Sequence, residues 1–483
     1  MTEIKDLQPS SIWRHFYALT RVPRPSGHVE KVQQFLLDFA RETGVEAFLD
    51  KAGNVVMRKA ATPGMENRKT VTLQAHMDMV PQKLSDSPHN FETDPIEAYV
   101  DGEWVKARGT TLGADNGIGV ATELAILASD DLKHPRLECL FTVDEETGLT
   151  GASAIDPGLL KGSMLINLDS EDDGEFFIGC AGGMNTTATF RYEKKEMPAG
   201  LFYFEVKVSG LKGGHSGGDI HLNRGNANKI LSRFLWQTMK ETDLKLSLIE
   251  GGNLHNAIPR EARAVCAVPM DYKETLRVEF NHFTADIEGE FAIADSGVRL
   301  SLESCDRPSH MIDDCTTKRL LYSLVACPHG VQRMSDEMPG IVETSTNLAA
   351  IKMTGNDSIL ITTSQRSSVE SSKKDIARTV ESVFALAGAE VEHSEGYPGW
   401  KPNPKSPIAN IVASTYEKLF GKKAKIIAIH AGLECGLFLE KYPHLDMVSV
   451  GPTMRGVHSP DEQLHIGDTQ KFWQLIVHVL ENI

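Results

Sequence analysis

The sequence lacks the features that mark membrane proteins, disulfide frameworks and nucleic-acid binders. No apolar run approaches the roughly 20 residues that a membrane span needs. The seven cysteines are scattered, odd in number and without a Cys-x-x-Cys pair, which argues against a disulfide frame or a cysteine-based zinc site. The 50 basic residues are outnumbered by 66 acidic ones, and the net charge of −16 argues against nucleic acid or an anionic membrane as a partner.

The bulk composition is typical of a soluble globular protein, with 41% hydrophobic and 24% charged residues. A chain of 483 residues is too long for one ordinary core, so we expect two domains. The first residues lack the basic and apolar segments of a signal peptide. Together with the unpaired cysteines, this predicts a cytoplasmic protein with free thiols.

Helices and strands alternate at both ends of the chain. Apolar residues at helical spacing predict a helix over 28–43, a hairpin over 45–57 and a final helix over 467–481. Between them, short apolar strands end close to acidic or imidazole side chains, at 71–75, 137–143, 164–168 and 447–450. In open α/β sheets the loops after parallel strands gather the ligands, so we expect these polar residues to form the site.

The middle of the chain has longer, alternating strands interleaved with helices, which is typical of an α+β domain. Helices are predicted near 224–240, 273–288 and 371–387, and two similar strand–helix–strand blocks lie before and after about residue 305. The proline-rich segment 397–404 is the predicted return linker. We therefore predict the α/β class, with a mixed-sheet catalytic domain (1–184 and 396–483) interrupted by an α+β lid (185–395) long enough for two ferredoxin-like units.

The segment His76-Met-Asp78 places an imidazole and a carboxylate two residues apart, where side chains of an extended segment point the same way. Asp78 can then accept the second ring N–H of His76, as outer carboxylates do for zinc-bound histidine. Taken alone, such a pair is more often a surface pair or a satisfied core pair. Its neighbours favour the metal interpretation.

Three adjacent acids, Asp144-Glu145-Glu146, follow the strand 137–143. Taken alone, they read as a solvated acidic turn. In an extended loop neighbouring side chains point apart, so Glu146 could bind a metal while Glu145 faces the cleft. A free glutamate beside a metal-activated water is the general base that metal-assisted hydrolysis needs.

The number of acids predicts two metal ions rather than one. Asp115, in the turn Gly113-Ala-Asp-Asn-Gly117 that opens a helix, offers a further carboxylate, although a turn or N-cap residue is the alternative. In one cleft, the acids carry five negative charges, which two divalent cations nearly balance. Those acids are Asp78, Asp115, Glu145, Glu146 and Asp169. Two metals that share one carboxylate make use of all these ligands.

Four segments resemble the co-catalytic zinc peptidases, the family that includes carboxypeptidase G and the aminoacylases, and within it the bacterial dipeptidases. These segments are 74–82, 106–119, 144–148 and 167–171. The similarity extends over essentially the whole chain, and the metal-binding pattern of the family is intact.

The resemblance implies two divalent metal ions, zinc by preference, with Co²⁺ or Mn²⁺ able to substitute. It also implies a role for each residue of the site. Asp115 would bridge the metals, His76 and Asp169 would complete one, Glu146 and His458 the other, Glu145 would be the general base, and Asp78 would orient His76. The residues alone select neither the bridging acid nor His458 among 17 histidines.

The resemblance also assigns roles within the predicted lid. His215, in the glycine-rich segment 213–219, would stabilise the oxyanion, although a flexible turn with an incidental histidine is the alternative. Asn256 and Arg366 would bind substrate, because a planar guanidinium can hold a C-terminal carboxylate at two points. Gly432 would offer that carboxylate a backbone contact.

The expected function is therefore a metal-dependent dipeptidase that acts on free dipeptides, including Xaa-His dipeptides such as carnosine. An N-acyl-amino-acid deacylase with the same metal centre is one alternative. A non-catalytic protein whose acids bind metal structurally is the other. The sequence allows a homodimer, and we expect a doubled lid to supply His215 from the same chain.

Overall fold

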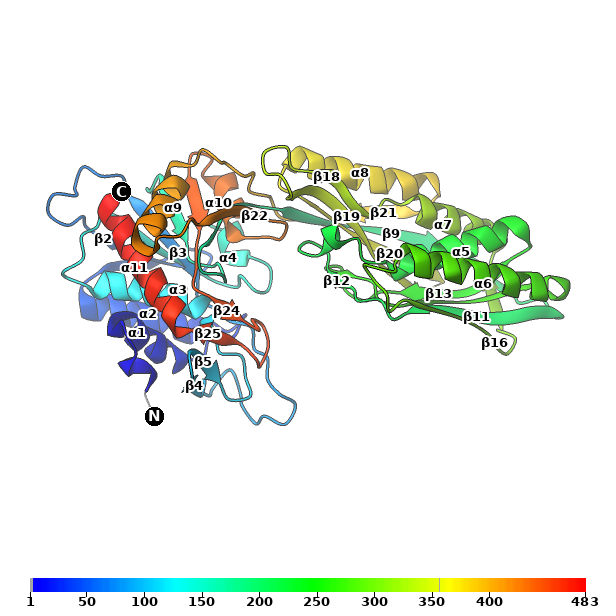
Figure 1. Cartoon of the computed structure of the whole chain (residues 1–483), viewed down its shortest axis with the longest axis horizontal. Coiled ribbons are helices and arrows are strands. Elements are labelled where there is room, and N and C mark those ends of the chain that lie inside the picture. The colour runs from blue at the N-terminus through cyan, green and yellow to red at the C-terminus, as the bar shows by residue number, and fades with distance from the viewer. Residues whose placement is uncertain (1–2, 356) are drawn as a thin grey trace. The chain divides into compact units, whose positions relative to one another are not determined.

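The computed structural model describes residues 3–355 and 357–483, which form two compact units (Figure 1). Unit 1 comprises Met1–Cys180, Trp400–Ala428 and Leu433–Ile483, and unit 2 comprises Ala181–Gly399 and Ile429–Gly432. The short segment 429–432 joins unit 2 because the backbone N–H of Ala181 donates to the carbonyls of Ile429 and Ala431. The assignment of the two units as catalytic domain and lid remains a prediction.

Unit 1 is built on an eight-stranded mixed sheet. Its strands, in spatial order, are β1 (Glu46–Leu49), β2 (Val55–Lys59), β6 (Leu137–Thr142), β3 (Val71–His76), β7 (Met164–Asn167), β23 (Asp446–Ser449), β8 (Glu175–Cys180) and β22 (Lys425–Ile429). The four strands from β6 to β23 run parallel, so their carboxyl ends meet at one edge of the sheet. Three of them, β3, β6 and β7, are buried along their whole length, as in parallel sheets covered on both faces.

Seven α-helices belong to unit 1 in the described part of the chain. They are α1 (Ser10–Thr20), α2 (Glu30–Thr43), α3 (Ala114–Ala128), α4 (Thr150–Ser153), α9 (Pro407–Phe420), α10 (Glu434–Lys441) and α11 (Ile466–Asn482). Local sequence explains their ends: Ser406 caps α9 through its side chain, Pro407 occupies its first turn, and Gly421 ends it in the left-handed conformation.

A second, four-stranded sheet of unit 1 joins β24 (Met454–Arg455), β25 (Gln463–His465), β5 (Trp104–Ala107) and β4 (Ala98–Asp101). The loop between β24 and β25 carries His458. The predicted helices at 28–43 and 467–481 and the strands before the site residues are confirmed, whereas α1, α9 and α10 were not predicted. No helix of the described chain is both long and apolar enough to cross a lipid bilayer.

Unit 2 contains two βαββαβ halves that share one nine-stranded sheet. The inner half is β11 (Leu201–Ser209), α5 (Ala227–Glu241), β13 (Lys245–Gly251), β15 (Ala262–Pro269), α6 (Lys273–Glu290) and β16 (Arg299–Ser304). The outer half is β9 (Gly182–Arg191), α7 (Asp314–Ala326), β19 (Val342–Thr354), β20 (Ser358–Ser367), α8 (Glu370–Leu386) and β21 (Glu390–His393). In both, the spatial order is fourth, first, third, second strand, which is the ferredoxin-like arrangement.

The two halves are nested rather than consecutive. The first strand of the outer half, β9, precedes the whole inner half, and the rest of the outer half follows it. The predicted repeat, with one block before and one after about residue 305, is therefore confirmed for every strand and helix of the two halves except β9. This strand belongs to the outer half but lies before residue 305. Sequence pattern could not reveal this, because β9 pairs with β20 and β21, which lie far along the chain.

The remaining strands of unit 2 are short. β10 (Lys194–Glu196) pairs with β17 (His310–Ile312), β12 (Gly214–His215) with β14 (Ala257–Ile258), and β18 (Gly330–Met334) with β19. The helices α5, α6, α7 and α8 lie along one face of the nine-stranded sheet (Figure 1). Their apolar faces cover one continuous core that includes Phe204, Phe234 and Phe384.

The two halves meet where β13 runs beside β19, with Gly251 opposite Ile351. The backbones approach closely there. A Cβ atom at Gly252 would lie 1.9 Å from the carbonyl oxygen of Ala349, and Gly252 has a φ of +69°. Only glycine satisfies both constraints, so this residue permits the continuous sheet.

We predict that Gly252→Ala lowers the free energy of unfolding by about 2 kcal/mol or more, from left-handed backbone strain and from the contact with Ala349. Calorimetric Tm values measure the effect. Gly289→Ala in α6 is the matched control, because a Cβ atom there meets nothing within 4 Å. Equal Tm values for the two variants would show that the junction tolerates a side chain.

Candidate metal centre

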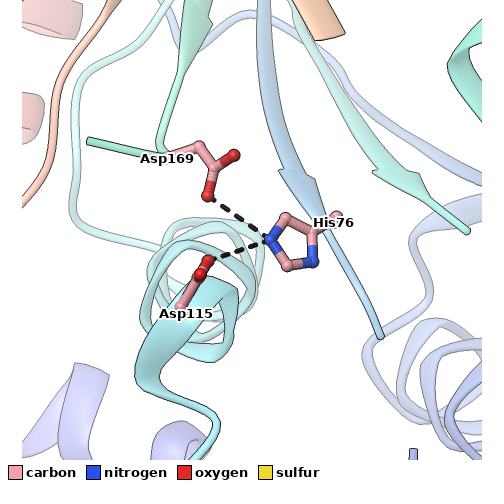
Figure 2. A group of neighbouring side chains, drawn as sticks. All are labelled: His76, Asp115 and Asp169. Carbon is pink, nitrogen blue, oxygen red and sulfur yellow. Dashed lines mark hydrogen bonds and ion pairs between the residues drawn. The ribbon is translucent and has the colours of Figure 1, made fainter. Parts of the chain in front are cut away.

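Two groups of potential metal ligands share Asp115. The first consists of His76, Asp115 and Asp169 (Figure 2), and the second of Asp115, Glu146 and His458. His76 Nε2 lies 3.0 Å from Asp115 Oδ1, and His458 Nε2 lies 3.1 Å from Asp115 Oδ2. Each carboxylate oxygen of Asp115 thus faces a different histidine, which is the geometry of a carboxylate that bridges two cations.

The candidate ligands come from four separate elements of the chain. His76 ends β3, and Asp169 follows β7, its parallel neighbour. Asp115 lies in the first turn of α3, at a position with non-helical backbone angles. His458 comes from the β24–β25 loop, where its φ is +63°. The parallel strands and the late loop therefore converge at one edge of the sheet.

Asp78 connects His76 to the acidic loop. His76 Nδ1 lies 3.2 Å from the backbone carbonyl oxygen of Asp78 and 3.5 Å from its carboxylate, so the other ring nitrogen, Nε2, faces the remaining candidate ligands. The Asp78 carboxylate also accepts hydrogen bonds from the backbone N–H of Glu145 (3.2 Å) and Glu146 (3.4 Å) and from the hydroxyl of Ser26 (2.7 Å). Asp78 therefore contacts the ring of His76 through its carbonyl and carboxylate oxygens and fixes the loop that carries two acids.

The segment after β6 is a tight turn, and the expectation of an extended loop was wrong. Asp144 has a φ of +51° and residues 145–148 form a turn. As a result, the carboxylates of Glu145 and Glu146 do not point to separate regions, because both have oxygen atoms within 4.8 Å of a His76 nitrogen. His458 Nε2 lies 3.0 Å from Glu146, so Glu146 also contacts the second ligand group.

The electrostatics of the site show a surplus of buried negative charge. Burial raises the pKa of Asp169 to about 7 and that of Glu145 well above its usual range. Hydrogen bonds to Asp115 and Glu146 raise the pKa of His458 to about 11. Although burial opposes it, the charge of Asp169 and hydrogen bonds to neighbouring carboxylates raise the pKa of His76 as well. The carboxylates therefore favour the protonated form of the two imidazoles. Burial and the neighbouring negative charges also favour the protonated form of Asp169 and Glu145.

A divalent cation fits the same atoms. The nitrogen and oxygen atoms that face each other, such as His76 Nε2 and Asp169 Oδ1 at 3.4 Å, are spaced like the ligands of one ion, which lie about 3.3 Å apart around tetrahedral zinc. Imidazole and carboxylate also suit borderline divalent ions. A cation can replace the shared protons without moving these side chains far.

Two buried residues that hold the site together were not predicted. Glu462 accepts hydrogen bonds from four consecutive backbone N–H groups, those of residues 112–115, at 2.7–3.2 Å. Arg24 donates to the carbonyls of Met77 and Asp78 at 3.1 and 2.9 Å and also to that of Gly113. Together they fix the strand end that carries His76 and the turn that carries Asp115. Neither stands in a pattern that marks this role.

In unit 2, the predicted residues His215 and Asn256 lie side by side. β12, which contains His215, pairs with β14, and the N–H of Ser216 donates to the carbonyl of Asn256 (2.8 Å). The Nδ1 atom of His215 accepts hydrogen bonds from the N–H groups of Gly217 and Gly218. Its proton is therefore on Nε2. Burial and the nearby Arg366 lower the pKa of His215, which favours this neutral donor form.

Arg366 is also connected to this cluster. Its Nε lies 3.4 Å from the hydroxyl of Ser216, and its Nη1 donates to the hydroxyl of Tyr397 (2.9 Å). Gly432 packs against the same tyrosine, since a Cβ atom there would lie 2.8 Å from the ring. The structure thus brings the four predicted residues of unit 2 into one neighbourhood, and their roles remain predictions.

We predict that Glu462→Gln weakens metal binding by about tenfold or more, as is typical when support of metal ligands is lost. Each carboxylate oxygen of Glu462 accepts hydrogen bonds from two backbone N–H groups. In the amide, an NH₂ group would replace one of these oxygens and face two N–H groups to which it cannot bond. Competition with a coloured chelator measures the affinity. Glu417→Gln on the exposed side of α9 is the control, and equal affinities would contradict the role of Glu462.

Comparison with known proteins places the whole chain in one family. The sequence profile of Peptidase family M20/M25/M40 matches residues 72–482. The cytosol non-specific dipeptidase of Escherichia coli K12 is 45% identical over 483 residues, which cover 100% of this chain and 99% of the relative. The crystal structure of aminoacylhistidine dipeptidase from Vibrio alginolyticus is 46% identical, with a TM-score of 0.93 over 100% of this chain and 98% of that one.

A more distant structure shares the fold. Aminopeptidase PepT from Bacillus cereus has a TM-score of 0.58 at 15% identity, over 98% of both chains. The profile match and the two full-length relatives confirm the resemblance drawn from the motifs. The chain belongs to Peptidase family M20/M25/M40.

Proposed function

We propose that the protein is a metal-dependent dipeptidase that hydrolyses free dipeptides, among them Xaa-His dipeptides such as carnosine. The observation that carries the proposal is the pair of ligand groups that share Asp115, with the carboxylate of Glu145 beside them. The names of the two full-length relatives, a cytosol non-specific dipeptidase and an aminoacylhistidine dipeptidase, support the substrate class. A cytoplasmic location and a homodimer remain predictions.

We further propose that the site holds two zinc ions, for which Co²⁺ or Mn²⁺ can substitute. A pair of divalent cations supplies Lewis acidity, which polarises a peptide carbonyl and makes water a better nucleophile at neutral pH. The proposed holding residues are Asp115 for both ions, His76 and Asp169 for one, and Glu146 and His458 for the other. Asp78 keeps His76 in position through Nδ1.

Glu145 is the proposed general base. It takes the proton from the attacking water and returns it to the amine of the leaving amino acid. The position of Glu145 is fixed, because its backbone N–H donates to the carboxylate of Asp78 and the turn keeps its side chain near His76. With the two ions bound, the carboxyl group of Glu145 would be held in the ionised form that a base requires.

The residues of unit 2 are proposed to bind the substrate. His215 offers an Nε2 proton to the carbonyl oxygen that becomes negative during attack, since two backbone N–H groups occupy its Nδ1. Arg366 binds the C-terminal carboxylate, and Asn256 and Gly432 assist. A guanidinium reserved for that carboxylate limits the leaving group to a single C-terminal residue. Supply of His215 from the same chain remains a prediction.

We predict that Glu145→Gln lowers kcat by about 10²–10⁴-fold with the metal content unchanged, because the proton acceptor is lost. Steady-state kinetics and metal analysis are measured on the same preparation. Asp144→Asn is the matched control: Asp144 belongs to the same turn, but its carboxylate binds the backbone N–H of Gly27 (2.7 Å). Full activity of Glu145→Gln would reject this residue as the base.

Chelation should abolish dipeptide hydrolysis, and addition of Zn²⁺, Co²⁺ or Mn²⁺ should restore it. A panel of free and N-acetylated dipeptides separates the alternatives. Preference for the N-acetylated set would identify a deacylase. Fewer than two bound ions and no turnover of any dipeptide would instead favour a non-catalytic metal-binding protein.

A further inference from the structure

Arg366 is a buried cation without an acidic partner. Arg366 is only 6% exposed, and among the described residues its side chain contacts hydroxyl groups and forms no ion pair with a carboxylate. Its two recorded side-chain partners are hydroxyl groups, those of Ser216 and Tyr397. A guanidinium stays charged in proteins, and a buried unpaired charge is costly. The site is therefore suited to bind an anion from outside the chain.

Tyr397 stands beside this cation with its proton free. Arg366 Nη1 can only donate, so the Tyr397 oxygen accepts at 2.9 Å, and its own hydrogen must point elsewhere. Among the described residues, the Tyr397 hydroxyl has no recorded acceptor. A phenol that accepts from a guanidinium and has a spare proton is suited to donate a second hydrogen bond to the anion that the guanidinium binds.

The ring of Tyr397 is held in this position from both sides. Cβ atoms would lie 2.7 Å from the ring at Gly183 and 2.8 Å from it at Gly432, so both positions need glycine to make room. The backbone is fixed too. Tyr397 and Gly183 exchange N–H···O bonds of 2.9 and 3.1 Å, and the buried Lys373 donates to the Tyr397 carbonyl at 2.6 Å.

Arg366 and Tyr397 line the same small cavity, which has a volume of about 120 Å³. Asn185 and His255 also line it. A water molecule takes about 30 Å³ in the liquid, so the cavity has room for a carboxylate group and few further atoms. Its size and its one unpaired cation suit the end of a small anionic substrate.

We propose that the Tyr397 hydroxyl is a second donor, beside Arg366, to the C-terminal carboxylate of the substrate, and that it contributes to selection of free carboxyl termini. This rests on the proposed dipeptidase function. Gly432 then serves mainly by leaving space for the Tyr397 ring. Tyr397 is a binding and specificity residue, and it takes no part in proton transfer.

The first test compares Tyr397→Phe with the wild-type full-length, metal-loaded enzyme on alanyl-histidine and alanyl-histidinamide. Loss of a hydrogen bond to a charged group should raise KM for the free dipeptide about tenfold. We expect kcat and metal content to stay close to wild type and kcat/KM for the amide to change less than twofold, whereas Tm should fall by a few degrees because Arg366 loses one of its two hydroxyl partners. Tyr322→Phe, which removes an exposed hydroxyl on α7, should change none of these values.

An unchanged KM for alanyl-histidine, or equal losses on the acid and the amide, would overturn the role of Tyr397. Calorimetric binding of free histidine to wild type and Tyr397→Phe tests the same contact without turnover. If wild type hydrolyses no dipeptide but binds histidine about tenfold more tightly than the variant, the proposed function fails and this inference stands. If both proteins bind histidine equally, the inference fails.

A second variant tests the role of Gly432. Gly432→Ala should raise KM in the wild-type background, because the added methyl group displaces the Tyr397 ring. In a Tyr397→Ala background, where the ring is absent, adding Gly432→Ala should change KM less than twofold further. Full additivity of the two substitutions would show that Gly432 acts independently of Tyr397.

Discussion

The arrangement of the site depends on one carboxylate, Asp115, whose two oxygens face two histidines that come from opposite ends of the chain. The position of Asp115 must be fixed to a fraction of an ångström, because both ligand groups use it. Glu462 provides this constraint, because its carboxylate accepts hydrogen bonds from the backbone N–H groups of residues 112–115. The same β24–β25 loop carries His458, so the loop that supplies this candidate ligand also anchors Asp115.

A buried polar row supports the site from within the sheet. Gln74 and Asn167 stand two residues before His76 and Asp169, and the Asn167 amide donates to Gln74 at 2.6 Å. Gln74 in turn donates to the carboxylate of Glu434 at 2.6 Å. Side chains two apart on a strand share a face, so the row lies directly beneath the ligands. Hydrogen bonds across adjacent strands thereby fix the spacing at which His76 and Asp169 emerge.

Sequence analysis was most successful where the information is local. Apolar strands that end at acids predicted where His76, Glu146 and Asp169 would meet, because parallel strand ends must share an edge. The family resemblance singled out Asp115 as the candidate bridge and His458 as a candidate ligand, and the structure brings both into the same cluster. The hydrogen bonds of Glu462 to residues 112–115 and the nesting of β9 could not be predicted. Each joins segments more than 150 residues apart, and no short sequence pattern marks such a contact. The turn at Asp144 was missed because its left-handed backbone conformation belongs to a residue that is not glycine.

The nested order of unit 2 also determines the sequence of events during synthesis. The inner half emerges from the ribosome as an uninterrupted ferredoxin-like module, so its four strands can pair before the outer half is complete. β9 is made earlier but has to wait for β20, with an unpaired edge that is prone to wrong association. His76, Asp115 and Asp169 are likewise synthesised well before His458. A nascent chain therefore acquires its two candidate ligand groups one after the other, and the second group has to wait for the β24–β25 loop.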